Sequence, residues 1–165
     1  MARRSRLAIV ADTHLRGGRP IPERAIAVAR ECDTVLHAGD IADEEALRAF
    51  AALGPPLLAV SGNVDSPEVR RLLPEEAVWE KCGCRIAMVH DSGAAKGRLA
   101  RMRRRFPEAD AVVFGHSHLP LHEEEDGFQI FNPGSATQRR RAPRHTMGIA
   151  EVSDGRVRFE LIALD

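Results

Sequence analysis

Short apolar runs alternate with stretches of helical spacing through the first half of the chain. Buried strands are predicted at residues 7–11, 34–38 and 57–60. Helices are predicted at residues 22–30 and 44–53, and residues 65–68 have the pattern of a cap and first turn. Asp43 is a candidate N-cap for the second helix, and Gly54-Pro55-Pro56 would end it. This alternation favours a parallel sheet in an α/β domain.

The second half of the chain is richer in predicted strands. A hairpin is predicted for residues 77–81 and 85–89, and a basic amphipathic helix for residues 95–106. Further strands are predicted at residues 111–114, 128–131, 147–152 and 157–162. Asp154-Gly155 has the composition of a tight turn between the last two. Because no repeat or linker interrupts the pattern, we expect one domain over residues 1–165.

Composition limits the class of protein. The chain has 165 residues and is 44% hydrophobic, which is enough for a packed core. No apolar run approaches the roughly 20 residues that a membrane helix needs. The basic N-terminus leads into an apolar run that is too short for a signal peptide. We therefore expect a cytoplasmic protein without a membrane partner.

Charge and cysteine content exclude two further classes. The formal net charge is +0, so no overall basic field indicates a nucleic-acid partner. Arginine clusters at residues 103–105 and 139–141 are interpreted as solvated surface, with substrate binding as the alternative. Three cysteines, an odd number without a secretory signal, argue against a disulfide framework. Cys82-Gly83-Cys84 lacks a second pair to complete a zinc site, which favours structural thiols.

Side chains of metal-binding type follow five of the predicted strands. They are Asp12 and His14, Asp40, Asn63, His90, and His116 with His118. Sites in α/β sheets form outside the carboxyl ends of strands, where loops converge, so we expect one shared site. Three other histidines, His37, His122 and His145, are interpreted as core or surface residues.

The donor set predicts two divalent cations. Imidazole nitrogen and carboxylate oxygen without thiolate suit manganese, iron, zinc, cobalt or nickel. Among these we expect manganese, with the others and magnesium as alternatives. Two such ions roughly 3.5–4 Å apart share a water, lower its pKa and clamp a phosphoryl group. The glycines before Asp40, Asn63 and His116 are expected to allow tight bends.

The ordered series Asp-x-His, Gly-Asp, Gly-Asn, His and Gly-His-x-His resembles the calcineurin-like metallophosphoesterase superfamily. The compact length and Asn132-Pro133-Gly134-Ser135 resemble its small bacterial and archaeal phosphodiesterases of the YfcE type. The resemblance implies a four-layer α/β/β/α sandwich of two packed mixed sheets with flanking helices. It implies one metal held by Asp12, His14, Asp40 and His118. It implies a second held by Asn63, His90, His116 and the bridging Asp40.

The resemblance also implies an activity, in which a metal-bridging hydroxide attacks a small phosphodiester or nucleotide-like substrate. Catalytic roles fall on Asp40, Asn63 and His90. Val64 occupies the place where many members have a histidine beside the leaving group, which disfavours a phosphomonoesterase or nucleotidase. Asp91 stands where glycine is common, and either orients His90 or faces water.

A protein-binding scaffold like the retromer subunit Vps29, which has this fold with an altered site, is the alternative from another class. The complete set of expected ligand types favours the enzyme. The oligomeric state and the physiological substrate stay open.

Overall fold

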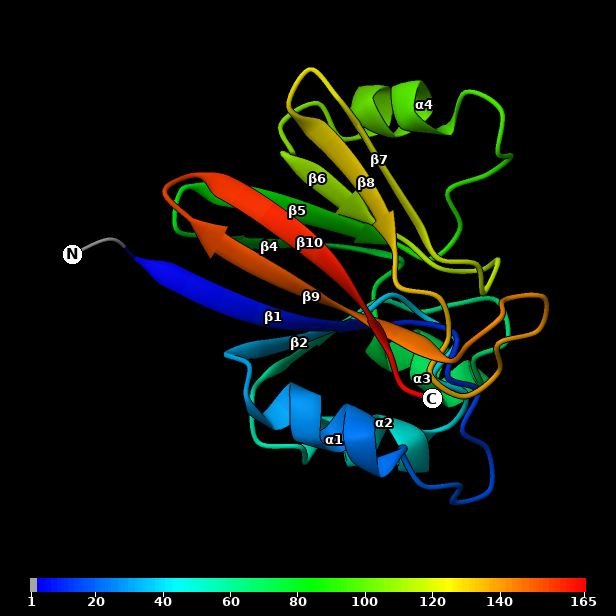
Figure 1. Cartoon of the computed structure of the whole chain (residues 1–165). Coiled ribbons are helices and arrows are strands. Elements are labelled where there is room, and N and C mark those ends of the chain that lie inside the picture. The colour runs from blue at the N-terminus through cyan, green and yellow to red at the C-terminus, as the bar shows by residue number, and fades with distance from the viewer. Residues whose placement is uncertain (1–2) are drawn as a thin grey trace.

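In the computed structural model, which describes residues 3–165, the chain forms two five-stranded sheets (Figure 1). The first sheet contains, in spatial order, β10 (Arg156–Ala163), β9 (Thr146–Ser153), β1 (Arg4–Val10), β2 (Thr34–His37) and β3 (Leu57–Ala59). β1, β2 and β3 pair in parallel, while β9 pairs antiparallel with β1 and with β10. The predicted parallel arrangement of the first three strands is confirmed.

The second sheet is also mixed. It contains, in spatial order, β4 (Glu76–Lys81), β5 (Cys84–Val89), β6 (Ala111–Val113), β8 (Phe128–Asn132) and β7 (Leu121–Glu125). β5, β6 and β8 pair in parallel, and the two edge strands pair antiparallel. β7 is absent from the sequence prediction because, at the sheet edge, it exposes four of its five residues, including three consecutive glutamates.

Two-residue turns close three antiparallel hairpins. Both central residues have positive φ at Cys82-Gly83, Asp126-Gly127 and Asp154-Gly155. Positive φ at both positions is the requirement of a type I′ turn, which matches the twist of the strands. The predicted turn at Asp154-Gly155 is confirmed, and the other two join β4 to β5 and β7 to β8.

Four short helices flank the sheets. They are α1 (Glu23–Arg30), α2 (Glu44–Ala51), α3 (Pro67–Leu72) and α4 (Arg98–Arg105). The predicted N-cap of α2 is confirmed, since the Asp43 carboxylate accepts a hydrogen bond of 2.9 Å from the Ala46 amide. α4 begins three residues later than predicted, after Gly97 in the left-handed conformation. No helix within residues 3–165 has the length and apolar content needed to span a membrane.

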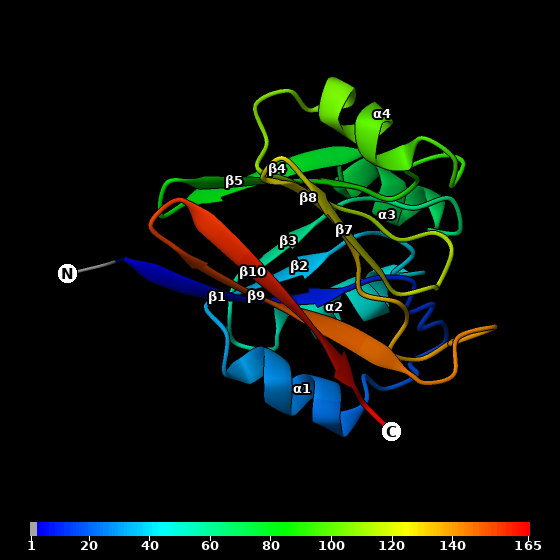
Figure 2. The same cartoon turned by 45° about the horizontal axis from the view of Figure 1, so that its top comes forward.

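Three apolar clusters fill the spaces between four layers (Figure 2). Alternate residues of β1 point in opposite directions, so Leu7 and Ile9 enter the cluster between the sheets. Ala8 and Val10 enter a second cluster, formed with α1 and α2. Met102 of α4 packs against the outer face of the second sheet in the third cluster. The predicted α/β/β/α sandwich is confirmed.

The three cysteines are free thiols, as predicted. Cys32 and Cys84 are buried within the apolar clusters. Burial raises the pKa of the Cys32 thiol to about 11 and that of the Cys84 thiol to about 12, so both are protonated at neutral pH. A structural role fits both residues.

Candidate metal centre

The candidate metal ligands lie at the carboxyl ends of strands from both sheets. Asp12 and Asp40 follow β1 and β2 of the first sheet, and His90 and His116 follow β5 and β6 of the second. The amide of Asp12 donates to the carbonyl of Gly39, which joins the first two loops. The sheets therefore bring together ligands that are far apart in the chain.

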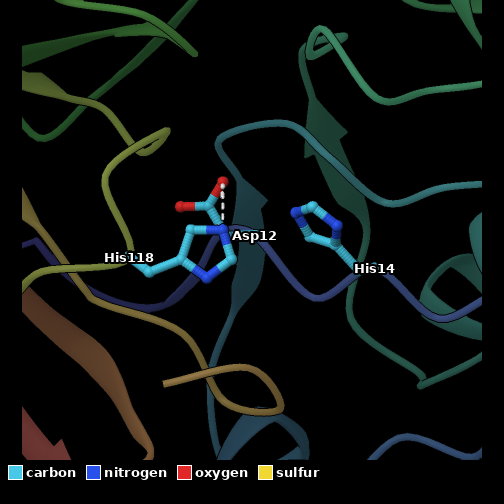
Figure 3. Close-up of side chains that lie close together, drawn as sticks. All are labelled: Asp12, His14 and His118. Atoms are coloured by element: carbon cyan, nitrogen blue, oxygen red, sulfur yellow. Dashed lines mark ion pairs between the residues drawn. The ribbon is translucent and has the colours of Figure 1, made fainter. Parts of the chain in front are cut away.

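The first group of candidate ligands is Asp12, His14 and His118 (Figure 3). One ligand atom from each residue lies within 4.8 Å of the other two. Asp12 Oδ2 and the Nε2 atoms of both histidines are buried and have no hydrogen-bond partner among residues 3–165. Because buried polar atoms are normally paired, these three fit a cation as their missing partner.

The second group consists of Asp12, Asp40 and His90. Oδ2 of Asp40 lies 3.3 Å from His14 Nε2 and 3.2 Å from His90 Nε2. A single carboxylate oxygen therefore faces an imidazole of each group. Asp12 also belongs to both groups, with Oδ1 3.8 Å from both His90 Nε2 and His118 Nε2.

Asn63 and His116 form the exposed side of the centre. Oδ1 of Asn63 lies 3.0 Å from His90 Nε2 and 3.2 Å from His116 Nδ1. The imidazole rings lie in pairs, His14 with His118 at 5.0 Å and His90 with His116 at 5.3 Å between centroids. The predicted division of ligands between two ions has the same pairs, and it remains a prediction.

Backbone carbonyls orient two of the imidazoles. Nδ1 of His90 donates to the Ala38 carbonyl at 2.8 Å, and Nδ1 of His118 donates to the Gln138 carbonyl at 2.5 Å. With the proton on Nδ1, each ring directs the lone pair of Nε2 into the site. Asp91, which was one predicted partner of His90, instead has an exposed carboxylate that accepts from the Gly93 amide. Of its two predicted roles, the structure supports the one that faces water.

Burial and charge set opposite protonation preferences within the centre. Burial works to raise the pKa of Asp40, but the neighbouring imidazoles of His14 and His90 outweigh it and hold this pKa well below its usual range. Burial raises the pKa of Asp12 and lowers the pKa of His118. Burial also works to lower the pKa of His90, but the Asp40 carboxylate raises it overall. Because ligands bind cations in their deprotonated forms, metal affinity should increase with pH.

The backbone is left-handed at five of the seven predicted ligands. They are Asp12 (φ 54°), His14 (47°), Asp40 (61°), His116 (76°) and His118 (62°). For residues other than glycine this conformation costs on the order of 1–3 kcal/mol each, and such strain clusters at functional sites. It also separates the side chains of His116 and His118, which a regular strand would place on one face.

Two of the three motif glycines serve a different purpose from the predicted one. Only Gly39 has positive φ (98°), whereas Gly62 and Gly115 do not. A Cβ atom at Gly62 would overlap the carboxylate and amide of Asp40, and one at Gly115 would lie 3.0 Å from Asp12 Oδ2. The prediction that these two allow tight bends is therefore wrong, because what they allow is the close approach of a neighbouring ligand.

Sequence reasoning missed the role of Asp65. Its buried carboxylate accepts hydrogen bonds from the amides of Ala42 (2.8 Å), Gly62 (2.7 Å) and Asp40 (3.3 Å). Ser66, rather than Asp65, caps α3 by accepting from the Val69 amide. Asp65 thus joins the loop that carries Asp40 to the loop that carries Asn63. A carboxylate two residues after the motif asparagine was the available signal.

The Asn-Pro-Gly-Ser segment fixes two ligand loops. The Ser135 hydroxyl donates to the Asp12 carbonyl at 2.8 Å, and the Thr137 hydroxyl donates to the Thr13 carbonyl at 2.5 Å. The Asn132 amide donates to the Gly115 carbonyl at 3.1 Å. This segment positions Asp12 and the loop of His116 without supplying a ligand.

The arginine clusters at residues 103–105 and 139–141 and two of the remaining histidines mainly contact other parts of the chain near the surface. Arg103 donates to the Glu125 and Asp126 carbonyls, and Arg139 donates to the Ala142 carbonyl within its own loop. His122 pairs with Gln129, and His145 pairs with Asp165. These contacts agree with the interpretation of both histidines as core or surface residues.

His37 lies buried beneath the centre, as a core histidine. Its Nδ1 accepts from the Gly39 amide at 3.2 Å, so Nε2 carries the proton and donates to the Thr13 hydroxyl at 2.9 Å. Burial, assisted by the positive charge of His90, lowers the pKa of His37 to about 3. The imidazole is therefore neutral at any pH above this value, although it lies near the ligands.

The stability of the metal-free protein should fall as pH falls from about 6.5 to about 3, in part through His37. In this range the unfolded chain binds a proton at His37 that the folded chain does not, so the stabilisation present above the unfolded pKa is lost. One such proton changes the free energy of unfolding by up to about 1.4 kcal/mol per pH unit. Urea unfolding at several pH values should show a shallower dependence for His37→Gln. Parallel curves for the two proteins would contradict the assignment.

Three clefts border candidate ligands. The first, of about 360 Å³, is bordered by Asn63, His90 and Asp91 together with Glu75, Arg70 and Arg105. The second, of about 400 Å³, is bordered by His14, Val64 and Gln138 together with Arg16, Gly17 and Arg19. The third, beside the C-terminus, is bordered by His14, Arg19, His145 and Asp165. The candidate ligands lie between the first and second clefts, which can receive the two sides of a substrate.

Comparison with known proteins shows the same architecture. A family model, the calcineurin-like phosphoesterase superfamily domain, matches residues 6–155. A protein of Methanothermobacter thermautotrophicus named "Probable metallophosphoesterase" is 28% identical over 134 residues, which cover 79% of this chain and 77% of the relative.

Solved structures resemble the chain over nearly its whole length. Vacuolar protein sorting 29 from Cryptosporidium parvum aligns with a TM-score of 0.78 and 20% identity, covering 98% of each chain. A protein described as a novel archaeal phosphodiesterase aligns with a TM-score of 0.75 and 21% identity, covering 95% of this chain and 99% of that chain. At these identities the two structures show a common fold alone.

Proposed function

The chain belongs to the calcineurin-like phosphoesterase superfamily, and we propose that it is a dinuclear metal-dependent phosphodiesterase. The proposal is carried by the position of Asp40 Oδ2, which lies within 3.3 Å of an imidazole nitrogen on either side. A carboxylate oxygen in this position suits a bridge between two cations. Manganese is our first choice for both ions, and the nitrogen and oxygen donors suit iron, zinc, nickel or cobalt as well.

The donor set fits the ions, because three buried ligand atoms lack any other partner among residues 3–165. When bound, two divalent ions lower the pKa of a water and neutralise charge on a phosphoryl group. The residues of the chain orient the imidazoles and hold the ligand loops in place. The Ala38 and Gln138 carbonyls hold His90 and His118 in the tautomer that directs Nε2 inward. Asp65 and Ser135 hold the loops that carry Asp40 and Asp12.

Asp40, Asn63 and His90 are the residues to which we assign catalysis. The Asn63 amide and the His90 imidazole border the first cleft and contact each other at 3.0 Å. With Nε2 directed into the centre, His90 would act through a bound ion. The Asn63 amide nitrogen can donate a hydrogen bond to a non-bridging phosphoryl oxygen while the ester group on that side stays bound. A small phosphodiester or nucleotide-like molecule fits the space of about 360 Å³.

Val64 supports a diester over a monoester. Its side chain is apolar and half-buried at the edge of the second cleft, where it has no proton to give to a leaving group. An alkyl alkoxide leaves poorly without a proton donor. Aryl diesters, whose leaving groups are stable anions, should therefore react faster than alkyl monoesters.

The proposed function is tested with metal-stripped protein that is reloaded with each of several divalent metals. Hydrolysis of bis(p-nitrophenyl) phosphate and of an alkyl phosphate monoester is measured together with metal content. We expect two ions per chain and selective hydrolysis of the aryl diester. A fully loaded protein that hydrolyses neither ester would contradict the proposal and favour the protein-binding scaffold.

Installing a proton donor should change the selectivity. Val64→His places an imidazole beside the leaving group, and a well-positioned general acid contributes about 10²–10⁴-fold. We expect the ratio of monoesterase to diesterase activity to rise by at least about tenfold. The matched control is Val64→Phe, which adds a ring without a proton and should leave the ratio low. A natural protein that already prefers alkyl monoesters would contradict the argument from Val64.

A further inference from the structure

The cleft beside Val64 carries only basic and neutral side chains. Two of its six bordering residues are arginines, Arg16 and Arg19, and none is acidic. The cleft on the other side differs, since Glu75 and Asp91 border it together with two arginines. The leaving-group side of the centre is therefore the more electropositive of the two.

Arg16 is fixed in place at the border of this cleft. Its Nη2 atom donates to the Val64 carbonyl at 2.9 Å, from 48 residues away in the chain. The loop that carries it is fixed by two further hydrogen bonds, from the Leu15 amide to the Ile41 carbonyl (3.0 Å) and from the Gly17 amide to the Asp43 carboxylate (3.1 Å). The guanidinium keeps other N–H groups free to bind an anion.

Arg19 is exposed and makes no ion pair or side-chain hydrogen bond with the rest of residues 3–165. The acidic groups that contact this loop are Asp43, through the Gly17 amide, and Glu45, which lies beside Gly18. Neither borders the cleft. Arg19 also borders a neighbouring cleft that includes Asp165, but the Asp165 carboxylate pairs with His145. An arginine that makes no ion pair among the described residues is suited to bind an anionic ligand group.

We propose that Arg16 and Arg19 bind an anionic leaving group, and that the natural substrate class is a phosphoanhydride diester. In such a molecule two phosphoryl groups share one oxygen, and each carries an ester. The inference rests on the proposed function and names the substrate of the same site. It joins two observations on one cleft, the absence of a proton donor at Val64 and the presence of two arginines beside it.

The chemistry of this leaving group explains both observations. An oxygen–phosphorus bond forms from water, the bridging P–O bond breaks, and its electron pair stays with the departing phosphate monoester. The proton lost by the water passes to solvent, and two phosphate monoesters result. Because the second pKa of a phosphate monoester is about 6, it departs at neutral pH without protonation. Its double negative charge is what the guanidinium groups stabilise.

The test compares two substrates with leaving groups that need no proton. Diadenosine diphosphate releases a phosphate monoester, and bis(p-nitrophenyl) phosphate releases a phenolate of lower charge. The readout is the kcat/KM for diadenosine diphosphate divided by the kcat/KM for bis(p-nitrophenyl) phosphate. Arg19→Gln should lower this ratio by about tenfold, which is at the low end of the effect expected from losing one exposed charge-assisted hydrogen bond. Arg19→Lys, which keeps the charge, should give a ratio between those of the natural protein and Arg19→Gln. Arg24→Gln, at an exposed position of α1, is the matched control and should leave the ratio unchanged.

A binding measurement provides a second readout. Calorimetric titration of the metal-loaded protein with adenosine monophosphate, the product, should show about tenfold weaker binding for Arg19→Gln than for the natural protein and Arg24→Gln. The inference is overturned if the natural protein hydrolyses the aryl diester but not diadenosine diphosphate. It is also overturned if Arg19→Gln leaves both the ratio and the affinity unchanged. If the natural protein hydrolyses neither substrate, the proposed function itself is contradicted.

Discussion

Replacing Asp40 with asparagine is expected to remove most of the activity and at least one metal ion per chain. The substitution keeps the shape of the side chain but deletes the charge that faces His14 and His90 at 3.3 and 3.2 Å. Removing one partner from a buried charged network costs about 3–5 kcal/mol. If that cost appears in the transition state, kcat/KM falls by about 10²–10⁴-fold. Elemental analysis and aryl diester hydrolysis measure the two effects.

Asp91→Asn provides the control for this experiment. Its carboxylate also lies near the centre, 4.0 Å from His116 Nε2, but it is exposed and belongs to neither group of candidate ligands. Metal content should stay within experimental error of the natural protein. Retention of two ions and full activity by Asp40→Asn would refute the bridging role of Asp40.

Asp65→Asn should have the second largest effect, although Asp65 is not a proposed ligand. Its carboxylate accepts three backbone hydrogen bonds in a buried position. An asparagine amide group would face at least one of these donors with its own N–H groups. We expect a loss of about 3 kcal/mol in the free energy of unfolding. We also expect at least about tenfold weaker metal binding, because the loops of Asp40 and Asn63 lose their common anchor.

Asp110→Asn separates general destabilisation from a specific effect on the centre. The Asp110 carboxylate also accepts a backbone hydrogen bond, from the Arg85 amide at 2.8 Å, but at the opposite end of β6. It should reduce thermal stability without changing metal affinity. If both variants weaken metal binding equally at a temperature where both are folded, Asp65 has no special positioning role.

The sequence predicted strands where apolar residues form an unbroken run, and it predicted ligands where metal-binding side chains follow such a run. β1 is apolar on both faces because layers cover both, so its run of apolar residues is unmistakable. β7 escaped prediction, because an exposed edge strand with three consecutive glutamates has no pattern that distinguishes it from a loop. The candidate ligands could be found because each follows a buried strand, and strand ends converge in such sheets.

The parts of the site that depend on long-range contacts could not be predicted. Nothing local to Ser135 indicates that its hydroxyl reaches the Asp12 carbonyl, 123 residues away. Gly62 was predicted to allow a tight bend. Instead, its missing side chain makes room for Asp40, which is a neighbour in space that the sequence cannot reveal. The partner of His90 Nδ1 is a backbone carbonyl, that of Ala38, and side-chain chemistry in the sequence cannot reveal it.

The origin of the ligands in two different sheets affects how long the folded protein survives. Asp12 follows a strand of one sheet and His116 a strand of the other, and the two residues are 104 positions apart. Contacts of such separation form only when the sheets dock, so the centre is completed late in folding. Ions held by both sheets would have to be released before the sheets separate, and they would bind the native state alone. Loss of metal to a chelator would therefore shorten the lifetime of the native protein, and cellular metal supply would govern its turnover as well as its chemistry.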